Sequence, residues 1–225
     1  MPWQDWIRAV EVEPSLYGAD FTRLGEQIEN LIRAGVLVFH YDIGDGHFVE
    51  PITIGPIVIE SISPLIHRLG GKIDVHLMVE EPAKHFAAVA AAGGDSVTFH
   101  IEAVDDVRAT IRAAREQELQ VGIAFNPETE PEAVVEFADA VDLVLCMSIN
   151  PGYSGQRFQE ATYERVRRLR AGLPESVLIQ VDGGVNEDNI KPLYDEGARL
   201  LVAASAIFGR EDLTRAYRRL LQQLT

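Results

Sequence analysis

The stretch HYDIGDGHF, residues 40–48, places a histidine and two aspartates where a buried strand should end. It follows the apolar run VLVF, residues 36–39, which is typical of a strand in a protein core. Polar side chains at the end of such a strand cost desolvation free energy unless they bind one another, a metal ion or a substrate. Imidazole and carboxylate groups can serve all three purposes, so this stretch is the first candidate for a functional site.

Side-chain alternation predicts which polar groups share a face, because successive residues of a strand point to opposite sides. Three segments carry polar residues opposite their apolar set: His40 and Asp42 in VLVFHYD, Asp74 and His76 in KIDVHLMV, and Gln180 and Asp182 in VLIQVD. In a closed barrel the apolar set must meet the surrounding helices, so the polar set points inward. We therefore expect His40, Asp42, His76 and Asp182 to meet at one rim of the barrel.

Short β-branched runs alternate with longer amphipathic segments along the chain, which indicates repeated βα units. Eight strands are predicted, at residues 9–14, 36–42, 72–79, 96–101, 119–125, 142–148, 177–182 and 200–205. Helical patterns include residues 20–35, 82–94, 105–117, 162–172 and 211–224. We predict an α/β fold with one (β/α)8 barrel domain over residues 1–225. A doubly wound open sheet is the rival, but the first turn, EPSLYGADF, lacks its glycine-rich phosphate fingerprint.

The amino-acid composition limits the kinds of molecule that this protein can bind. The formal charge of −15 and the pI near 4.8 argue against binding to nucleic acid or to an anionic membrane. The single cysteine, Cys146, excludes an internal disulfide framework and fits a reducing compartment. The start MPWQDWIRAV lacks a signal-peptide core, and no apolar run approaches the roughly 20 residues of a membrane helix. We expect a cytoplasmic protein with a small-molecule partner; a homo-oligomer is compatible with the sequence.

Eight sequence blocks resemble the ribulose-phosphate 3-epimerase family, in its order and at its spacings. The blocks are PSLYGADFTRLG, HYDIGDGHFVEPITIGP, DVHLMVEEP, FHIEA, FNPET, MSINPGYSGQRF, VDGGVNEDNI and ASAIFG. The resemblance implies a barrel of the ribulose-phosphate-binding type. It also implies one divalent metal ion bound by His40, Asp42, His76 and Asp182, with Asp42 and Asp182 serving as the acid and the base.

The implied chemistry explains why such a set is needed. A 3-epimerase removes the proton from C3 of a 2-keto sugar phosphate and returns one to the opposite face, so it needs two bases on opposite sides. A divalent ion acts as a Lewis acid that stabilises the charge developing on the carbonyl oxygen. A mixed histidine and aspartate set suits zinc, iron, manganese or cobalt and does not choose among them.

Three glycine-bearing turns, NPGYSG, DGGV and AASAIFG, follow the sixth to eighth strands and can bring backbone N–H groups to an anion. We expect Ser205 to cap a short helix beside this anion. By resemblance, the phosphate cradle comprises Gly152, Tyr153, Ser154, Gly155, Gly183, Gly184, Ala204 and Ser205. Further substrate contacts are implied for Ser15, His76, Met78 and Met147.

Several departures from the family pattern predict an altered sugar preference or rate. Gly44 replaces a methionine and is expected to leave the pocket wall open, while Glu50, Pro51, Gln180 and Ala204 change neighbouring positions. A related epimerase acting on a hexulose 6-phosphate is therefore an alternative. Two further alternatives are a catalytically silent phosphate-binding barrel and a decarboxylase or synthase.

A decarboxylase or synthase would need a lysine at the reacting centre, whereas Lys72 lies at the early end of its strand. Three other residues receive structural interpretations. His100 has inward parity and is expected to pack beside the site or support it. Asp45 is assigned to the turn and Cys146 to the core.

Overall fold

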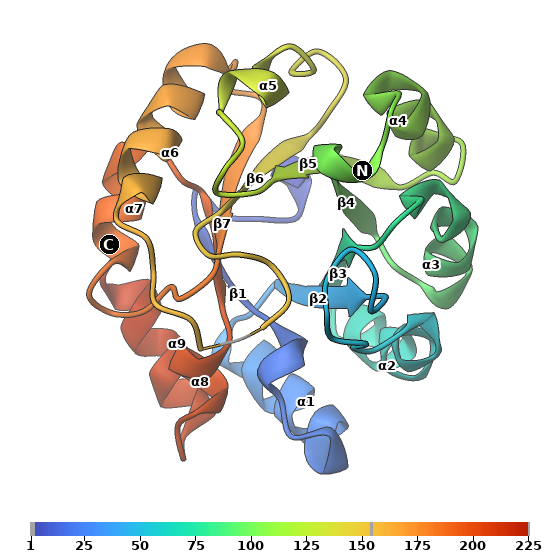
Figure 1. Ribbon diagram of the computed structural model, residues 1–225. Coiled ribbons are helices and arrows are strands. Elements are labelled where there is room, and N and C mark those ends of the chain that lie inside the picture. The colour runs from blue at the N-terminus through green and yellow to red at the C-terminus, as the bar shows by residue number, and fades with distance from the viewer. Residues whose placement is uncertain (1–2, 154, 225) are drawn as a thin grey trace.

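Eight parallel strands form the centre of the molecule (Figure 1). The computed structural model describes residues 3–153 and 155–224 of the 225-residue chain. The strands are β1 (Glu11–Pro14), β2 (Val38–Gly44), β3 (Lys72–Met78), β4 (Ser96–His100), β5 (Gln120–Phe125), β6 (Leu143–Met147), β7 (Leu178–Asp182) and β8 (Leu200–Ala203). β1 pairs with β8, and a bridge between Ser15 and His40 joins the β1 end to β2, so the barrel is nearly closed. The predicted (β/α)8 fold is confirmed.

Helices surround this barrel in the alternating order expected of βα units (Figure 1). They are α1 (Leu24–Ala34), α2 (Pro56–Arg68), α3 (Phe86–Ala92), α4 (Val107–Arg115), α5 (Glu132–Val135), α6 (Ala161–Gly172), α7 (Ile190–Glu196), α8 (Ser205–Phe208) and α9 (Leu213–Gln222). Among the described residues, none of these helices has the length and apolar character needed to cross a membrane.

Local sequence signals account for several helix ends. Asp106 and Asp212 precede α4 and α9, and each side chain accepts a hydrogen bond from a backbone N–H of the first turn. α1 and α3 end at Gly35 and Gly93, whose φ angles of 113° and 97° favour glycine. These residues account for where α4 and α9 begin and where α1 and α3 end.

Apolar residues form two layers that follow the predicted alternation. Outward residues such as Phe39, Val75 and Ile179 are fully buried in the layer between the strands and the helices. Inward residues such as Leu145 and Leu200 form a smaller cluster inside the barrel. Trp3, Trp6 and the other residues near the start of the chain were assigned no role from the sequence.

The N-terminal segment contributes to the inner cluster of the barrel. Trp3 and Trp6 belong to that cluster, with Trp3 fully buried and the two rings 4.9 Å apart at their centroids. Lys72, the first residue of β3, lies 5.2 Å from the centroid of the Trp6 ring. Because β3 runs from Lys72 toward the site, the tryptophans lie at the end of the barrel opposite the polar rim.

Truncating the buried indole should therefore destabilise the fold. We expect Trp3→Ala to lower the free energy of unfolding by about 3–5 kcal/mol, because it removes a large buried side chain and leaves a cavity. Urea unfolding followed by circular dichroism measures the change. Ile57→Ala, at a side chain that is 74% exposed, is the matched control and should change stability by no more than about 0.5 kcal/mol. Equal effects of the two substitutions would show that Trp3 does not stabilise the barrel.

Candidate active site

The strand register brings the predicted polar residues to one end of the barrel. Asp42 on β2 is the register partner of His76 on β3, so their inward side chains lie next to each other. Asp182 ends β7, in register with Met147 of β6. Ligand atoms of His40, Asp42, His76 and Asp182 all lie within 4.8 Å of one another.

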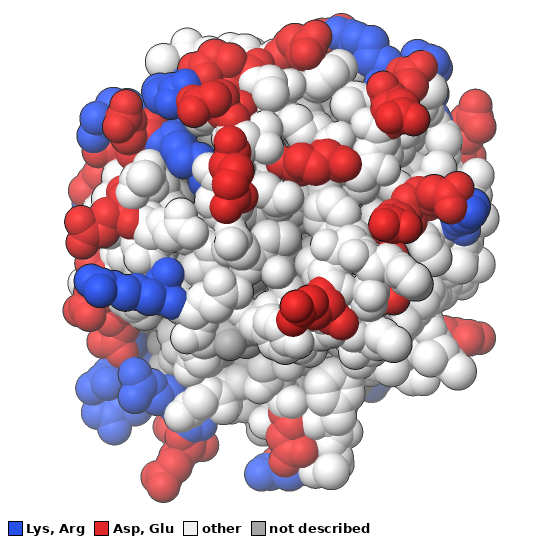
Figure 2. Space-filling model, in the orientation of Figure 1, with Lys and Arg blue, Asp and Glu red and all other residues white. Residues whose placement is uncertain are grey.

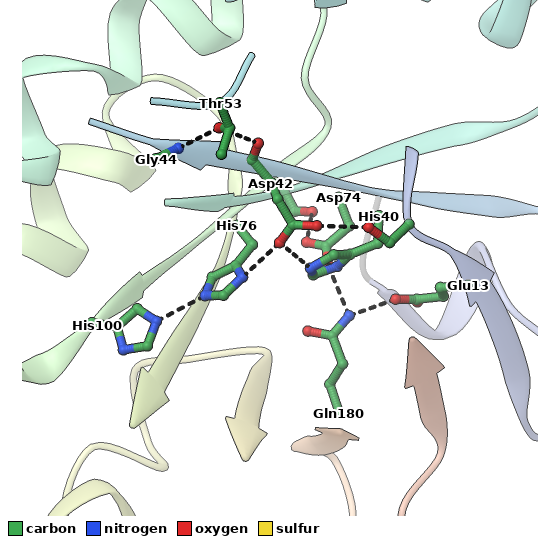
Figure 3. Close-up of polar contacts among 11 residues, drawn as sticks. Glu13, His40, Asp42, Gly44, Thr53, Asp74, His76, His100 and Gln180 are labelled. Atoms are coloured by element: carbon green, nitrogen blue, oxygen red, sulfur yellow. Dashed lines mark hydrogen bonds and ion pairs between the residues drawn. The ribbon is translucent and has the colours of Figure 1, made fainter. Parts of the chain in front are cut away.

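Asp42 is the centre of this group (Figure 3). Its Oδ1 lies 3.2 Å from His40 Nε2 and 3.0 Å from His76 Nδ1. Its Oδ2 accepts a hydrogen bond from Ser15 Oγ at 2.7 Å. Both histidines are fully buried and Asp42 is 5% exposed, so these contacts form away from bulk water.

The two carboxylates are driven to different protonation behaviour. Burial acts to raise the pKa of Asp42, but the adjacent His40 and His76 outweigh it and hold the pKa below its ordinary value. Burial, and then repulsion from Asp42, raise the pKa of Asp182 to about 7. Asp42 is therefore ionised at neutral pH, whereas Asp182 still holds a proton in part of the molecules.

Each histidine has a second contact behind it. His40 Nδ1 lies 3.1 Å from Asp74 Oδ2, and the Asp74 carboxylate also accepts hydrogen bonds from Ser96 Oγ at 2.7 Å and Gln180 Nε2 at 2.8 Å. The Gln180 amide also donates to Glu13, as Figure 3 shows.

The contact behind His76 is a second imidazole. His76 Nε2 lies 2.8 Å from His100 Nε2. Burial lowers the pKa of His100 to about 4, so this ring is neutral at pH 7. His100 was expected to pack beside the site or support it, and its contact with His76 agrees with that interpretation.

The donor set fits a divalent transition-metal ion. Two imidazoles and two carboxylates present ligand atoms from one buried corner. His40 Nε2 is buried and makes no hydrogen bond within the described residues, although it faces Asp42. A buried polar nitrogen without a hydrogen bond is unfavourable, and a cation bound between it and the carboxylates would satisfy it.

A cavity of about 1280 Å³ opens above this group. Its lining includes both aspartates and most residues predicted to contact substrate, namely Ser15, Met78, Met147, Gly152, Tyr153, Gly155, Gly183, Gly184, Ala204 and Ser205. His76 lies beneath the lining and reaches the site through Asp42. Ser154 lies outside the described residues.

Backbone geometry explains the glycines of the second turn. Gly183 has a φ of 111°, and a Cβ there would approach Ile149 Cγ1 to 2.5 Å, so a larger residue would be both strained and crowded. The expected cap by Ser205 is not observed. Ala204 occupies the N-cap position of α8, and Ser205 is the first helical residue, because the helix starts one position earlier than a serine cap requires.

The expected open wall at Gly44 is wrong. A Cβ at Gly44 would lie 2.9 Å from Val49 Cγ2 and 3.0 Å from Pro51 O. Gly44 N donates to Thr53 Oγ1 at 2.6 Å, and this hydroxyl donates to Asp42 O at 3.0 Å. The loop after β2 therefore folds back over Gly44 and fills the space that the missing side chain leaves.

Three structural interpretations agree with the observed contacts. Asp45 accepts backbone hydrogen bonds from His47 and Phe48, as a turn residue should. Cys146 is buried in the outer layer, and burial raises its pKa to about 12. Lys72 pairs with Asp95 at 2.8 Å, at the end of β3 away from the site.

Several residues near the site carried no predicted role. Tyr17, Asn186, Arg210 and Arg215 also line the cavity, and neither arginine has an ion pair among the residues described. Figure 2 shows acidic side chains around this face of an acidic molecule, so local cations would matter to an anionic ligand. An arginine at the end of an exposed helix is common, and no sequence signal distinguishes these two.

Known proteins with similar sequences are sugar-phosphate epimerases. The model of the ribulose-phosphate 3 epimerase family matches residues 11–208. A ribulose-phosphate 3-epimerase from Bacillus subtilis is 38% identical over 211 residues, covering 92% of this chain and 96% of the relative. Ribulose-phosphate 3-epimerase 2 from Cupriavidus necator is 39% identical over 224 residues, covering 96% and 92%.

Solved structures of lower identity share the fold. Orotidine 5'-phosphate decarboxylase from Pyrococcus horikoshii OT3 gives a TM-score of 0.68 at 16% identity, covering 95% of this chain and 99% of that one. Thiamine phosphate pyrophosphorylase from Pyrococcus furiosus gives 0.68 at 17%, covering 96% of each chain. At these identities the likeness concerns the barrel alone.

The pKa of Asp182 predicts a pH-dependent effect of its replacement. We expect Asp182→Asn to stabilise the metal-free protein, by an increment that grows between about pH 4 and pH 7 and exceeds about 1 kcal/mol above pH 7. In this interval unfolding releases the Asp182 proton, because the carboxyl ionises near 3.8 when unfolded and near 7 when folded. Rising pH therefore favours unfolding of the parent but not of the Asn variant.

Urea unfolding of chelator-treated protein at several pH values measures this increment. Asp188→Asn is the control, since Asp188 lines the same cavity but is exposed. An Asp182→Asn increment that stays constant across the pH range would contradict the raised pKa.

Proposed function

The chain belongs to the ribulose-phosphate 3-epimerase family, and from this premise we propose that it interconverts ribulose 5-phosphate and xylulose 5-phosphate. The observation that carries the mechanism is the pair Asp42 and Asp182. They enter one cavity from different strands, β2 and β7, with pKa values displaced in opposite directions. Such a pair can hold one acid and one base at neutral pH.

The two aspartates carry the proposed proton transfer. Asp42 is ionised and can accept the C3 proton, while Asp182 can hold a proton for delivery to the other face of C3. In the reverse direction the two residues exchange these parts. Ser15 orients Asp42 through a 2.7 Å hydrogen bond to Oδ2, which leaves Oδ1 toward the histidines.

We further propose that His40, Asp42, His76 and Asp182 hold one divalent metal ion, with zinc, iron, manganese and cobalt all compatible with the donor set. When bound, the ion would supply Lewis-acid stabilisation of the negative charge on the carbonyl oxygen. The buried His40 Nε2, which has no hydrogen bond within the described residues, supports this assignment.

The rest of the cavity is suited to the sugar phosphate. Met78 and Met147 are almost fully buried and offer an apolar surface beside the acids. The loops carrying Gly152, Tyr153, Gly155, Gly183, Gly184, Ala204 and Ser205 supply the proposed phosphate cradle. Arg210 and Arg215 line the same cavity and oppose the repulsion that a protein of charge −15 exerts on a dianion.

The activity is tested with ribulose 5-phosphate in deuterated water. We expect xylulose 5-phosphate to form with deuterium at C3, because the departing proton exchanges with solvent before one returns to the opposite face. Nuclear magnetic resonance follows both the epimer ratio and the label. A chelator-treated sample should be inactive and should recover with a divalent transition metal.

Each other outcome has a definite meaning. Faster turnover of a hexulose 6-phosphate would identify the related epimerase as the correct assignment. Binding of either phosphate without exchange at C3 would identify a silent phosphate-binding barrel. Full turnover by demonstrably metal-free protein would remove the metal from the proposal.

Because each aspartate is proposed to serve one face of the substrate, replacing either should largely stop epimerisation but not all proton exchange at C3. Asp42→Asn and Asp182→Asn should each slow epimerisation by about two to four orders of magnitude, since each removes one proton transfer. Provided the metal remains bound, one variant should still exchange C3 only from ribulose 5-phosphate and the other only from xylulose 5-phosphate. The surviving carboxylate still reaches its own face of the substrate.

Metal content must be measured beside the exchange rates, because both aspartates are also proposed ligands. The Asp188→Asn variant serves as a control for loss of one carboxylate in the same cavity. A variant that keeps its metal and interconverts the epimers at near parental rate would exclude the replaced residue as a base.

A further inference from the structure

The two ring nitrogens of His76 face different groups. Nδ1 lies 3.0 Å from Asp42 Oδ1, on the side of the proposed metal ion, and Nε2 lies 2.8 Å from His100 Nε2. Two neutral imidazole nitrogens at this distance form a hydrogen bond only if one carries the proton and the other accepts it. The tautomer of His100 therefore decides the tautomer of His76.

Glu102 stands on the far side of His100. It lies in the short 3₁₀ helix Ile101–Ala103, directly after β4, and its Oε2 is 3.4 Å from His100 Nδ1. Its Oε1 accepts hydrogen bonds from Asn126 N at 2.8 Å and from Thr129 Oγ1 at 2.5 Å. Oε1 is therefore committed to the loop after β5, and Oε2 is the oxygen that faces the ring.

The charge of Glu102 sets the direction of the hydrogen bonds that link Glu102, His100 and His76. Burial acts to raise its pKa, but the neighbouring His100 ring and the hydrogen bonds from Thr129 and Asn126 lower the pKa to about 2, so the group is ionised. An ionised carboxylate only accepts hydrogen bonds. The His100 nitrogen beside it is thus favoured as an N–H, which leaves His100 Nε2 as an acceptor toward His76.

We propose that Glu102 and His100 are positioning residues that hold His76 in the tautomer with its Nδ1 lone pair directed at the metal ion. His76 Nε2–H donates to His100 Nε2, and His100 Nδ1–H is directed at Glu102. The inference rests on the proposed metal-dependent function. It assigns a role to two residues that do not touch the ion.

The surroundings favour such a chain. His76 and His100 are fully buried, and the Phe48 ring lies against His100 with centroids 4.8 Å apart. Water is thus kept from competing for the ring nitrogens, and hydrogen bonds are stronger in such a dry environment. The other histidine, His40, reaches a buried carboxylate directly, through the 3.1 Å contact with Asp74.

Glu102→Gln tests the proposal because it should reverse which nitrogen donates in each of these contacts while keeping the shape of the side chain. The Gln oxygen must take the Oε1 place to accept from Asn126 and Thr129, so the amide NH₂ faces His100 Nδ1. His100 would then carry its proton on Nε2, and His76 would carry one on Nδ1, where it opposes metal binding. We expect Zn²⁺ affinity to fall about 10- to 100-fold, measured by competition with a chelator.

The tautomers themselves are the second readout. Two-dimensional ¹H–¹⁵N spectra of the histidine rings should report Nδ1–H for His100 in the zinc-loaded parent and Nε2–H in the Glu102→Gln variant. Glu60→Gln, at an exposed residue of α2, removes the same charge and should change neither affinity nor tautomer. His100→Phe keeps a ring in the space but removes the acceptor, so it should also weaken Zn²⁺ binding.

The outcomes separate this proposal from the proposed activity. A Glu102→Gln variant that binds Zn²⁺ as tightly as the parent, with the same His100 tautomer, would overturn the positioning role and leave the epimerase assignment intact. A parent that binds no Zn²⁺ would overturn the metal site and the positioning role together. A parent that binds Zn²⁺ with the expected tautomers but does not epimerise would leave the positioning role standing.

Discussion

The Asp42 carboxylate is the contact on which the candidate site depends. It accepts a hydrogen bond from Ser15 after β1, faces His40 of its own strand, and meets His76 of β3. Three adjoining strand ends are thereby tied together through two oxygen atoms. Because the group is almost fully buried, its charge depends on these three contacts, and losing them would leave a poorly solvated charge, which is far costlier than an exposed one.

That constraint extends into the barrel. If both histidines bind the proposed metal ion, each must present an unprotonated nitrogen to it, so each needs an acceptor for the proton on its other nitrogen. Asp74 meets this need for His40, and Gln180 then lies between the Asp74 and Glu13 carboxyls, donating to both. An amide suits this position because it supplies two donors, whereas an ionised carboxylate would add a further negative charge beside two acids. The sequence departure at Gln180 is thus consistent with the charges around it.

The sequence predicted those parts of the fold that depend on periodicity. The eight strands, the inward parity of His40, Asp42, His76 and Asp182, and the glycine-terminated helices all follow from local pattern. Contacts made by irregular segments were not accessible in this way. The packing of Trp3 in the barrel, the alignment of Glu102 with His100, and the Ala204 cap position depend on loop paths that no period encodes. Arg210 and Arg215 reach the cavity for the same reason.

The loop after β2 shows why single departures from a pattern are unreliable guides to specificity. Gly44 by itself suggested an enlarged pocket, yet Val49 and Pro51 occupy the space beside it. The same two residues approach Gly152, where a Cβ would lie 3.2 Å from each, so this loop packs against the loop after β6. Partial desolvation and the negative charge of the nearby Glu50 raise the pKa of Tyr153, which lies on the loop after β6. The departures at residues 44, 50 and 51 therefore act as one unit that shapes the approach to Asp42, and any effect on sugar preference must come from their joint conformation.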